Sequence, residues 1–156
     1  MIYLIWDIGL VLGLSFLNKI MKEPRITPNY ISELKNNEIF VFGSNEAGIH
    51  GAGAAKLARD KFGARQFCGS GHFGKTFAIP TKDSNIKTLP IEKIKLYIKR
   101  FIQFVRLHPS LTFLVTEIGC GLAGYEPSEI APLFEEVINL ENVKLPKRFW
   151  DVLIKQ

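Results

Sequence analysis

Hydrophobic residues follow two different patterns along the chain, and each predicts a type of secondary structure. Residues 39–42 and 111–115 are short apolar runs without polar alternation, which is typical of strands buried on both faces of a parallel sheet. Residues 91–105 instead carry apolar side chains at steps of three and four, with lysine and arginine on the other face. This second pattern predicts an amphipathic helix that begins at Pro90 and ends before Pro109.

Glycine and proline mark the ends of further predicted elements. A helix is expected over residues 54–62, where Gly63 follows in the position that commonly stops a helix. A second helix is expected over residues 127–138. Residues 76–79 predict a short strand that ends at Pro80, because proline cannot donate to a central ladder.

Three segments give weaker patterns. Thr27 and Pro28 have the residue types of a helix N-cap and first helical position, so a short helix is expected next. Its apolar residues would be Tyr30, Ile31 and Leu34. The glycine-rich residues 67–75 predict a turn or hairpin tip, and residues 143–156 predict either an edge strand or a short helix.

The order strand, glycine loop, helix occurs twice, over residues 39–62 and 111–138. In a parallel sheet both loops lie at the carboxyl edge of the strands, where they can form one cleft. Gly51 and Gly53 in the first loop leave backbone N–H groups uncovered, so an anion can approach closely. The alternative is a tight turn in which small residues only allow the helix to pack on the sheet.

Length and composition limit the class of protein. The chain has 156 residues, of which 47% are hydrophobic and 22% charged, which predicts one globular α/β domain. The net charge of +5 comes from scattered basic residues, with a modest cluster over residues 87–106. This charge favours an anionic ligand or weak nucleic-acid contact, although most of these lysines fit a solvated helix face. Cys68 and Cys120 have no metal-type spacing, so the default expectation is a reducing cytoplasm.

The first residues of the chain have a different composition from the rest. Residues 1–17 are almost wholly apolar, interrupted by Asp7 and Ser15. They lack the leading positive charge and small-residue cleavage site of a secretory signal. A membrane span needs about 20 apolar residues, and a central aspartate costs roughly 3 kcal/mol on insertion. The favoured interpretation is an extension, residues 1–20, outside a domain of residues 21–156, with translation starting at Met21; a membrane anchor is the second interpretation.

Residues 69–76 match the phosphate-loop pattern G-x-x-x-x-G-K-[ST] at every fixed position. That motif needs a helix directly after the loop, so that the helix N-terminus faces the phosphates. Here the next residues are β-prone and reach Pro80 within four positions. The match is therefore interpreted as accidental, within a glycine-rich hairpin.

Three motifs together resemble the macro domain family. They are Val41-Phe42-Gly43-Ser44-Asn45 followed by His50-Gly51-Ala52-Gly53-Ala54-Ala55, then Ile79-Pro80-Thr81-Lys82, and finally Ile118-Gly119-Cys120-Gly121-Leu122-Ala123-Gly124-Tyr125. The resemblance extends over residues 26–138 and is closest to a branch found in phages and bacteria. It implies a three-layer αβα fold with a mixed sheet that binds ADP-ribose. Some members of the family hydrolyse ADP-ribosyl or O-acetyl-ADP-ribose bonds.

The resemblance implies a set of ligand-binding residues, with no metal and no cofactor. Asn45 would contact the distal ribose, Tyr125 would stack near it, and residues 119–124 would wrap the diphosphate. Glycine N–H donors and two helix N-termini would stabilise the diphosphate. The implied residues are Gly43, Ser44, Asn45, His50, Gly51, Gly53, Ala54, Gly119, Cys120, Gly121, Leu122, Ala123, Gly124 and Tyr125.

Lys82 is the implied catalytic residue. In the branch that resembles the terminal ADP-ribose protein glycohydrolase and the DNA-de-ADP-ribosylating antitoxins, a lysine at this position attacks the anomeric carbon of ribose. That glycohydrolase also has an aspartate directly after Gly-Cys-Gly-Leu, where this chain has Ala123. Glu126, Asp83 and His50 are the candidates to replace it.

Two functions follow from this resemblance. The first is hydrolysis of an ADP-ribosyl linkage, in which the partner is an ADP-ribosylated molecule and modified nucleic acid is among the substrates. The alternative is a non-catalytic module that binds ADP-ribose or another NAD-derived nucleotide. In that case Lys82 is an ordinary exposed or phosphate-binding lysine.

Overall fold

The computed structural model describes residues 24–155, so the predicted extension over residues 1–20 lies outside the described residues. Within the described part of the chain, no helix is both long enough and apolar enough to cross a membrane.

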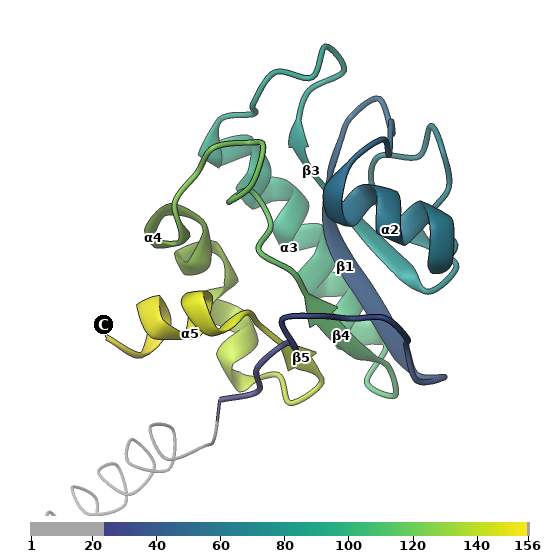
Figure 1. The fold of residues 1–156 in the computed structure, drawn as a ribbon. Helices are drawn as coiled ribbons and strands as arrows, with labels where there is room; N and C mark the ends of the chain where they lie inside the picture. The colour runs from purple at the N-terminus through teal and green to yellow at the C-terminus, as the bar shows by residue number, and fades with distance from the viewer. Residues whose placement is uncertain (1–23, 156) are drawn as a thin grey trace, which may run out of the picture.

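The fold is built on one sheet with the strand order β2-β3-β1-β4-β5 (Figure 1). The strands are β1 (Glu38–Asn45), β2 (Gly71–Phe73), β3 (Thr76–Lys82), β4 (Thr112–Val115) and β5 (Val143–Lys144). All neighbouring pairs are parallel except β2 with β3. The two strands predicted to precede glycine loops, β1 and β4, are therefore direct neighbours, and their loops leave the sheet at the same edge.

Helices cover both faces of the sheet (Figure 1). On one face, Phe40 and Phe42 of β1 pack with α2 (Gly53–Lys61). On the other face, Ile39 and Val41 belong to a larger core. That core is completed by α3 (Ile91–Leu107), the 3₁₀ helix η1 (Ala131–Asn139) and α5 (Lys147–Ile154). Because β1 is buried on both faces, it carries the unbroken apolar run that predicted it.

Several predicted elements are confirmed. Helix α3 buries the apolar face given by the three- and four-residue steps, namely Ile94, Ile98, Phe101, Ile102 and Val105. Helix α2 ends at Lys61, and Gly63 follows with a φ of +86°, a backbone conformation that glycine adopts at little cost. The C-terminal segment forms both of the predicted alternatives, β5 and α5.

The helix predicted after Thr27 does not form. Instead Ile26 pairs with Leu145 in a parallel bridge, and the Thr27 N–H donates a 2.8 Å hydrogen bond to the Leu145 carbonyl. The residues after it stay irregular, with Tyr30 exposed and Ile31 buried. A short helix gains little from propensity alone, so pairing with the distant Leu145 prevails.

The prediction that Pro80 ends the strand is wrong, because β3 continues to Lys82. Strand β2 pairs with β3 only as far as Ala78, so on that side no ladder hydrogen bond is required from Pro80. On the other side Pro80 lies opposite Ser44, and the register then shifts so that Lys82 lies opposite Asn45. This irregularity brings Lys82 to the edge of the sheet beside β1.

The helix predicted over residues 127–138 is divided into α4 (Pro127–Ile130) and the 3₁₀ helix η1. Pro132 lies in the first turn of η1. A proline inside an α-helix removes one hydrogen bond and clashes with the carbonyl four residues earlier, so the chain continues in the tighter form. Ile130, Phe134 and Val137 are nevertheless buried, as the apolar spacing predicts.

Candidate functional site

A hollow of about 510 Å³ lies at the carboxyl edge of the sheet. It is lined by residues of the loops after β1, β3 and β4, which leave the sheet at the same end (Figure 1). Its volume is in the range of ligand-binding pockets. The predicted site residues that line it are Gly43, Ser44, Asn45, Gly51, Gly53, Ala54, Lys82, Gly119, Cys120, Gly121, Leu122 and Ala123. The two glycine loops therefore form one cleft, as the topology of a parallel sheet predicts.

Two groups of backbone N–H donors line this hollow without hydrogen-bond partners among residues 24–155. One group is the N-terminus of α2, where Ala52 provides no side-chain cap and the N–H groups of residues 53–55 are free. The other group is the loop after β4, where the N–H groups of residues 121–123 are free. Free N–H groups at a helix N-terminus carry a partial positive charge, so this arrangement suits an anion.

The sequence motifs predict two helix N-termini beside the anion. The second of them, that of α4 (Pro127–Ile130), is not available. Helix α4 begins with a capping box, in which the Glu126 carboxylate accepts from the first turn and the Glu129 carboxylate accepts from the Glu126 N–H. These two carboxylates satisfy the N–H groups and are negatively charged. The donors on this side of the hollow therefore come from the loop alone.

Asn45 and Lys82 lie opposite each other in neighbouring strands. The Asn45 amide holds the loop after β1, because its oxygen accepts a 3.0 Å hydrogen bond from the Ile49 N–H and its nitrogen donates one of 2.8 Å to the Ile49 carbonyl. One amide hydrogen of Asn45 remains for a ligand. The Lys82 amine has no hydrogen bond or ion pair within the described part of the chain.

Tyr125 and Gly124 do not line the hollow. The Tyr125 ring packs against the larger core, and its hydroxyl donates a 2.6 Å hydrogen bond to the Leu89 carbonyl. A second bond, 3.0 Å from the Thr88 hydroxyl to the Ala123 carbonyl, joins the same two loops. Tyr125 therefore ties the loop after β4 to the loop after β3 and is not placed to stack on a ribose in this structure.

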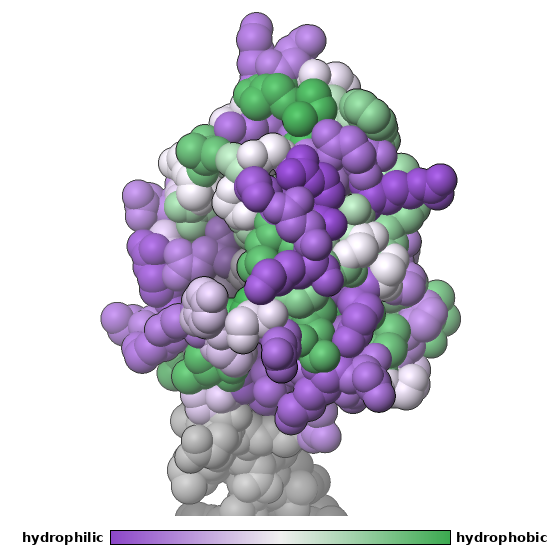
Figure 2. All heavy atoms as spheres, turned by 45° about the vertical axis from the view of Figure 1, so that its right-hand side comes forward, coloured by the Kyte–Doolittle hydropathy of each residue, from purple (hydrophilic) through white to green (hydrophobic). Residues whose placement is uncertain are grey.

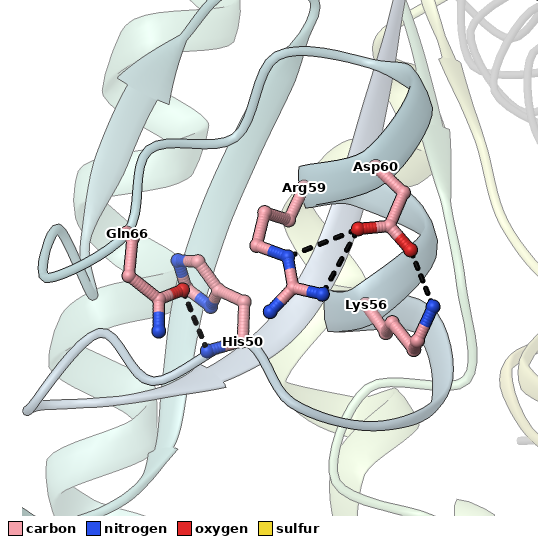
Figure 3. Close-up of polar contacts among 5 residues, drawn as sticks. All are labelled: His50, Lys56, Arg59, Asp60 and Gln66. Carbon is pink, nitrogen blue, oxygen red and sulfur yellow. Dashed lines mark hydrogen bonds and ion pairs between the residues drawn. The ribbon is translucent and has the colours of Figure 1, made fainter.

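His50, drawn with its Gln66 contact in Figure 3, also lies outside the hollow. Its ring is fully buried and edge-on to Phe42. The ring Nε2 lies 3.1 Å from the Arg65 carbonyl and 3.2 Å from the Cys68 carbonyl, so this nitrogen carries the proton, while Nδ1 has no partner among the described residues. The His50 backbone N–H donates to Gln66. His50 thus holds the segment of residues 65–68 against the sheet.

None of the three acids or bases considered as a replacement for an aspartate at Ala123 is directed into the hollow. His50 is buried elsewhere, and Glu126 caps α4. Asp83 accepts hydrogen bonds of 2.9 Å from the Lys87 N–H and 2.8 Å from the Asn85 N–H, and these bonds lower the pKa of its carboxyl. The acidic residue that lines the hollow is Glu117, which is paired with Arg148 at 2.9 Å.

Cys120 lines the hollow but is a poor nucleophile. Burial, and to a smaller extent the nearby Glu117, raise the pKa of its thiol to about 11. A thiol rather than a thiolate therefore predominates at neutral pH. Within residues 24–155, no cluster of three or more histidine, cysteine, aspartate or glutamate side chains could hold a metal ion.

The segment that matches the phosphate-loop pattern forms the predicted hairpin. Strands β2 and β3 pair antiparallel. The lysine and threonine of the pattern form hydrogen bonds to backbone carbonyls of the protein. The Lys75 amine donates to the Leu34 carbonyl at 3.1 Å, and the Thr76 hydroxyl donates to the Phe73 carbonyl at 2.7 Å. A strand rather than a helix follows the loop, so the interpretation of the match as accidental is confirmed.

A smaller hollow of about 290 Å³ adjoins the first one. The two hollows share Gly53, Ala54, Thr116 and Glu117. The smaller hollow is also lined by Tyr30, whose side chain is exposed, and by Thr27, whose hydroxyl is buried without a partner among the described residues. The sequence motifs do not reveal this second hollow, because the residues that line it come from five separate segments.

Two apolar residues of the larger hollow, Ile49 and Ile86, were not predicted from the sequence. Like the predicted Leu122, they line it although their side chains are exposed. No periodic pattern marks exposed apolar residues in loops.

Neither the models of known protein families, nor curated proteins, nor solved structures give a significant match to this chain.

Proposed function

We propose that this protein binds ADP-ribose, or a close derivative, in the hollow between the two glycine loops. One observation supports this proposal most directly: two sets of free backbone N–H groups line the same hollow. They belong to residues 53–55 and residues 121–123. A diphosphate carries negative charge and many acceptor oxygens, and it can receive hydrogen bonds from both sets without a metal ion.

The two adjoining hollows favour a ligand with a bulky group on each side of the diphosphate. The distal ribose would occupy the larger hollow, beside Asn45 and Lys82. The adenosine would occupy the smaller hollow, where Tyr30 offers an exposed aromatic face and the Thr27 hydroxyl lacks a partner among residues 24–155. Buried polar groups are normally hydrogen-bonded, so the Thr27 hydroxyl is a candidate to bind the ligand.

We further propose that Lys82 cleaves the bond between the ribose and the group attached to it. The free amine would form a bond from Nζ to the anomeric carbon, and the attached group would leave with the electrons of the broken bond and take up a proton. Water would then release ADP-ribose from the lysine. The Lys82 amine has no ion-pair partner within the described residues, which leaves it available for this role.

The alternative function is binding without cleavage. Ala123 favours it, because a methyl group can neither donate nor accept a proton where related hydrolases have an aspartate. Glu117 is the carboxylate that could take that role, but Arg148 is already paired with it.

Calorimetric titration of ADP-ribose, together with release assays on an ADP-ribosylated protein and an ADP-ribosylated oligonucleotide, tests both proposals. Lys82→Arg keeps the charge but removes the nucleophilic amine, and Lys87→Ala is the matched control, since Lys87 lies five residues further on and outside the hollow. We expect wild type, Lys82→Arg and Lys87→Ala all to bind ADP-ribose. Only wild type and Lys87→Ala should cleave ADP-ribose from the modified protein or oligonucleotide. Binding without release by any protein would support the alternative, and absence of binding at millimolar ADP-ribose would refute the proposed function.

A further inference from the structure

Three exposed apolar side chains surround the larger hollow, each from a different loop. Ile49 follows β1, Ile86 follows β3 and Leu122 follows β4, and their exposed fractions are 46%, 43% and 80%. Figure 2 shows apolar surface beside hydrophilic groups at the upper end of the molecule, the end where these loops lie in Figure 1. Isolated exposed apolar residues are common, but a group of them around one hollow marks a binding surface.

The backbone of Ile86 is strained. Its φ is +63°, a left-handed conformation that a β-branched side chain rarely adopts. The conformation is imposed by the tight turn of residues 83–87, in which the Asp83 carboxylate accepts from the N–H groups of Asn85 and Lys87, and the Asp83 carbonyl accepts from the Ile86 N–H. Strain of this kind is often found where a residue contacts a ligand.

Hydrogen bonds also hold the loops that carry the other two side chains. The Asn45 amide fixes the backbone of Ile49 through two hydrogen bonds. The loop that carries Leu122 is tied to the loop of Ile86 by the bonds from Thr88 to Ala123 and from Tyr125 to Leu89. The backbone that carries each of the three apolar side chains is therefore held by hydrogen bonds, which lowers the cost of ordering these loops when a ligand binds.

The charges that line the hollow are few. Among the described residues that line it, Lys82 and Glu117 are the only ionisable ones apart from the thiol of Cys120. Glu117 also lines the smaller hollow and is paired with Arg148, so it lies on the side away from the ribose that we place by Lys82. A positively charged group next to Lys82 would find no carboxylate partner among the described residues that line the hollow, and the neighbouring Asp83 carboxylate is engaged with the N–H groups of its own turn.

We propose that Ile49, Ile86 and Leu122 form an apolar clamp around the group attached to the distal ribose, and that this group is uncharged and mainly apolar in the substrate. The inference rests on the proposed function, because it takes the position of the ribose from it. Contact of an apolar group with the clamp would also exclude water from the Lys82 amine until that group has left.

The test compares the binding of three probes to the full chain carrying Lys82→Ala, which prevents turnover. The probes are ADP-ribose, a phenyl ether of ADP-ribose at the anomeric carbon, and ADP-ribosylarginine. We expect the phenyl ether to bind about tenfold more tightly than ADP-ribose, and ADP-ribosylarginine to bind no more tightly than ADP-ribose.

Ile86→Asn is the diagnostic variant, because asparagine tolerates a positive φ and replaces the apolar side chain by a polar one. Phe67→Asn is its matched control. Phe67 also has a positive φ, +66°, and is 77% exposed, but it does not line the hollow. We expect Ile86→Asn to abolish the preference for the phenyl ether and Phe67→Asn to preserve it. Leu122→Ser provides a second variant at an exposed position that the fold does not require.

Two results would overturn the inference while the proposed function stands: ADP-ribose binds but the phenyl ether binds no better, or the preference survives in both Ile86→Asn and Leu122→Ser. If none of the probes binds at millimolar concentration, the proposed function fails and the inference fails with it. Thermal unfolding of each variant shows that any loss of preference comes from a folded protein.

Discussion

Gly121→Glu is the substitution that tests most directly the position that we propose for the diphosphate. Gly121 lines the larger hollow, and a Cβ built at this position meets no other atom within 4 Å. Its φ lies outside the left-handed region, so a side chain fits without backbone strain. We therefore expect the melting temperature to stay within about 2 °C of wild type.

The effect of Gly121→Glu on binding follows from the added charge. A carboxylate about 5 Å from one phosphate charge costs about 3 kcal/mol at an effective dielectric constant of about 20. Salt and rotation of the side chain reduce this cost, so we expect ADP-ribose affinity to fall by at least about tenfold at 0.15 M salt. Gly121→Gln has nearly the same shape without the charge, and we expect a smaller loss. Calorimetry measures both, and wild-type affinity in a stable Gly121→Glu protein would refute the placement of the diphosphate.

Three further predictions concern the structure around the hollow. Gly69→Ala should destabilise the fold by more than about 3 kcal/mol in urea unfolding, because its Cβ would lie 2.0 Å from the Asn45 carbonyl oxygen; Gly51→Ala, whose Cβ meets nothing, should be nearly neutral. Tyr125→Phe should cost about 1 kcal/mol of unfolding free energy by removing the bond to Leu89, whereas weaker ADP-ribose binding at unchanged stability would instead show that Tyr125 contacts the ligand. Alkylation of Cys120, followed by mass spectrometry, should be slow at pH 8 and accelerate about tenfold per pH unit up to its pKa of about 11. The thiol pKa is raised above its ordinary value of 9.0, so deprotonation opposes folding and stability should fall as the pH rises from 9 toward 11; rapid alkylation at pH 7 would contradict this.

The local sequence was sufficient for elements whose burial follows a simple period. Residues 39–42 are apolar at every position because both faces of β1 are covered, and α3 repeats apolar residues every three or four positions because one face is covered. Local sequence was misleading at Thr27 and Pro80. At Thr27 a pairing with Leu145, far along the chain, replaced a helix that its own residues favoured, and at Pro80 a register shift let β3 continue.

The same division applies to the candidate site. The glycine motifs predicted which loops form the hollow, because free backbone N–H groups at the ends of parallel strands depend on glycine and on strand order. His50 and Tyr125 both belong to the motifs, but the sequence did not show that their side chains point away from the hollow. His50 contacts the Arg65 carbonyl, and Tyr125 contacts the Leu89 carbonyl. The sequence also did not show that Ile49 and Ile86 border the hollow together with Leu122.

The sequence by itself therefore determined the order of the elements, the helices and strands with regular apolar spacing, and the loops rich in uncovered N–H groups. Those properties depend on residues close together in the chain. The tertiary structure alone decided which side chains face the hollow and which are instead engaged in contacts between loops. It also decided that Lys82 lies opposite Asn45 in the sheet. These outcomes depend on contacts between β1, β3 and β4, whose residues lie tens of positions apart, so no local pattern records them.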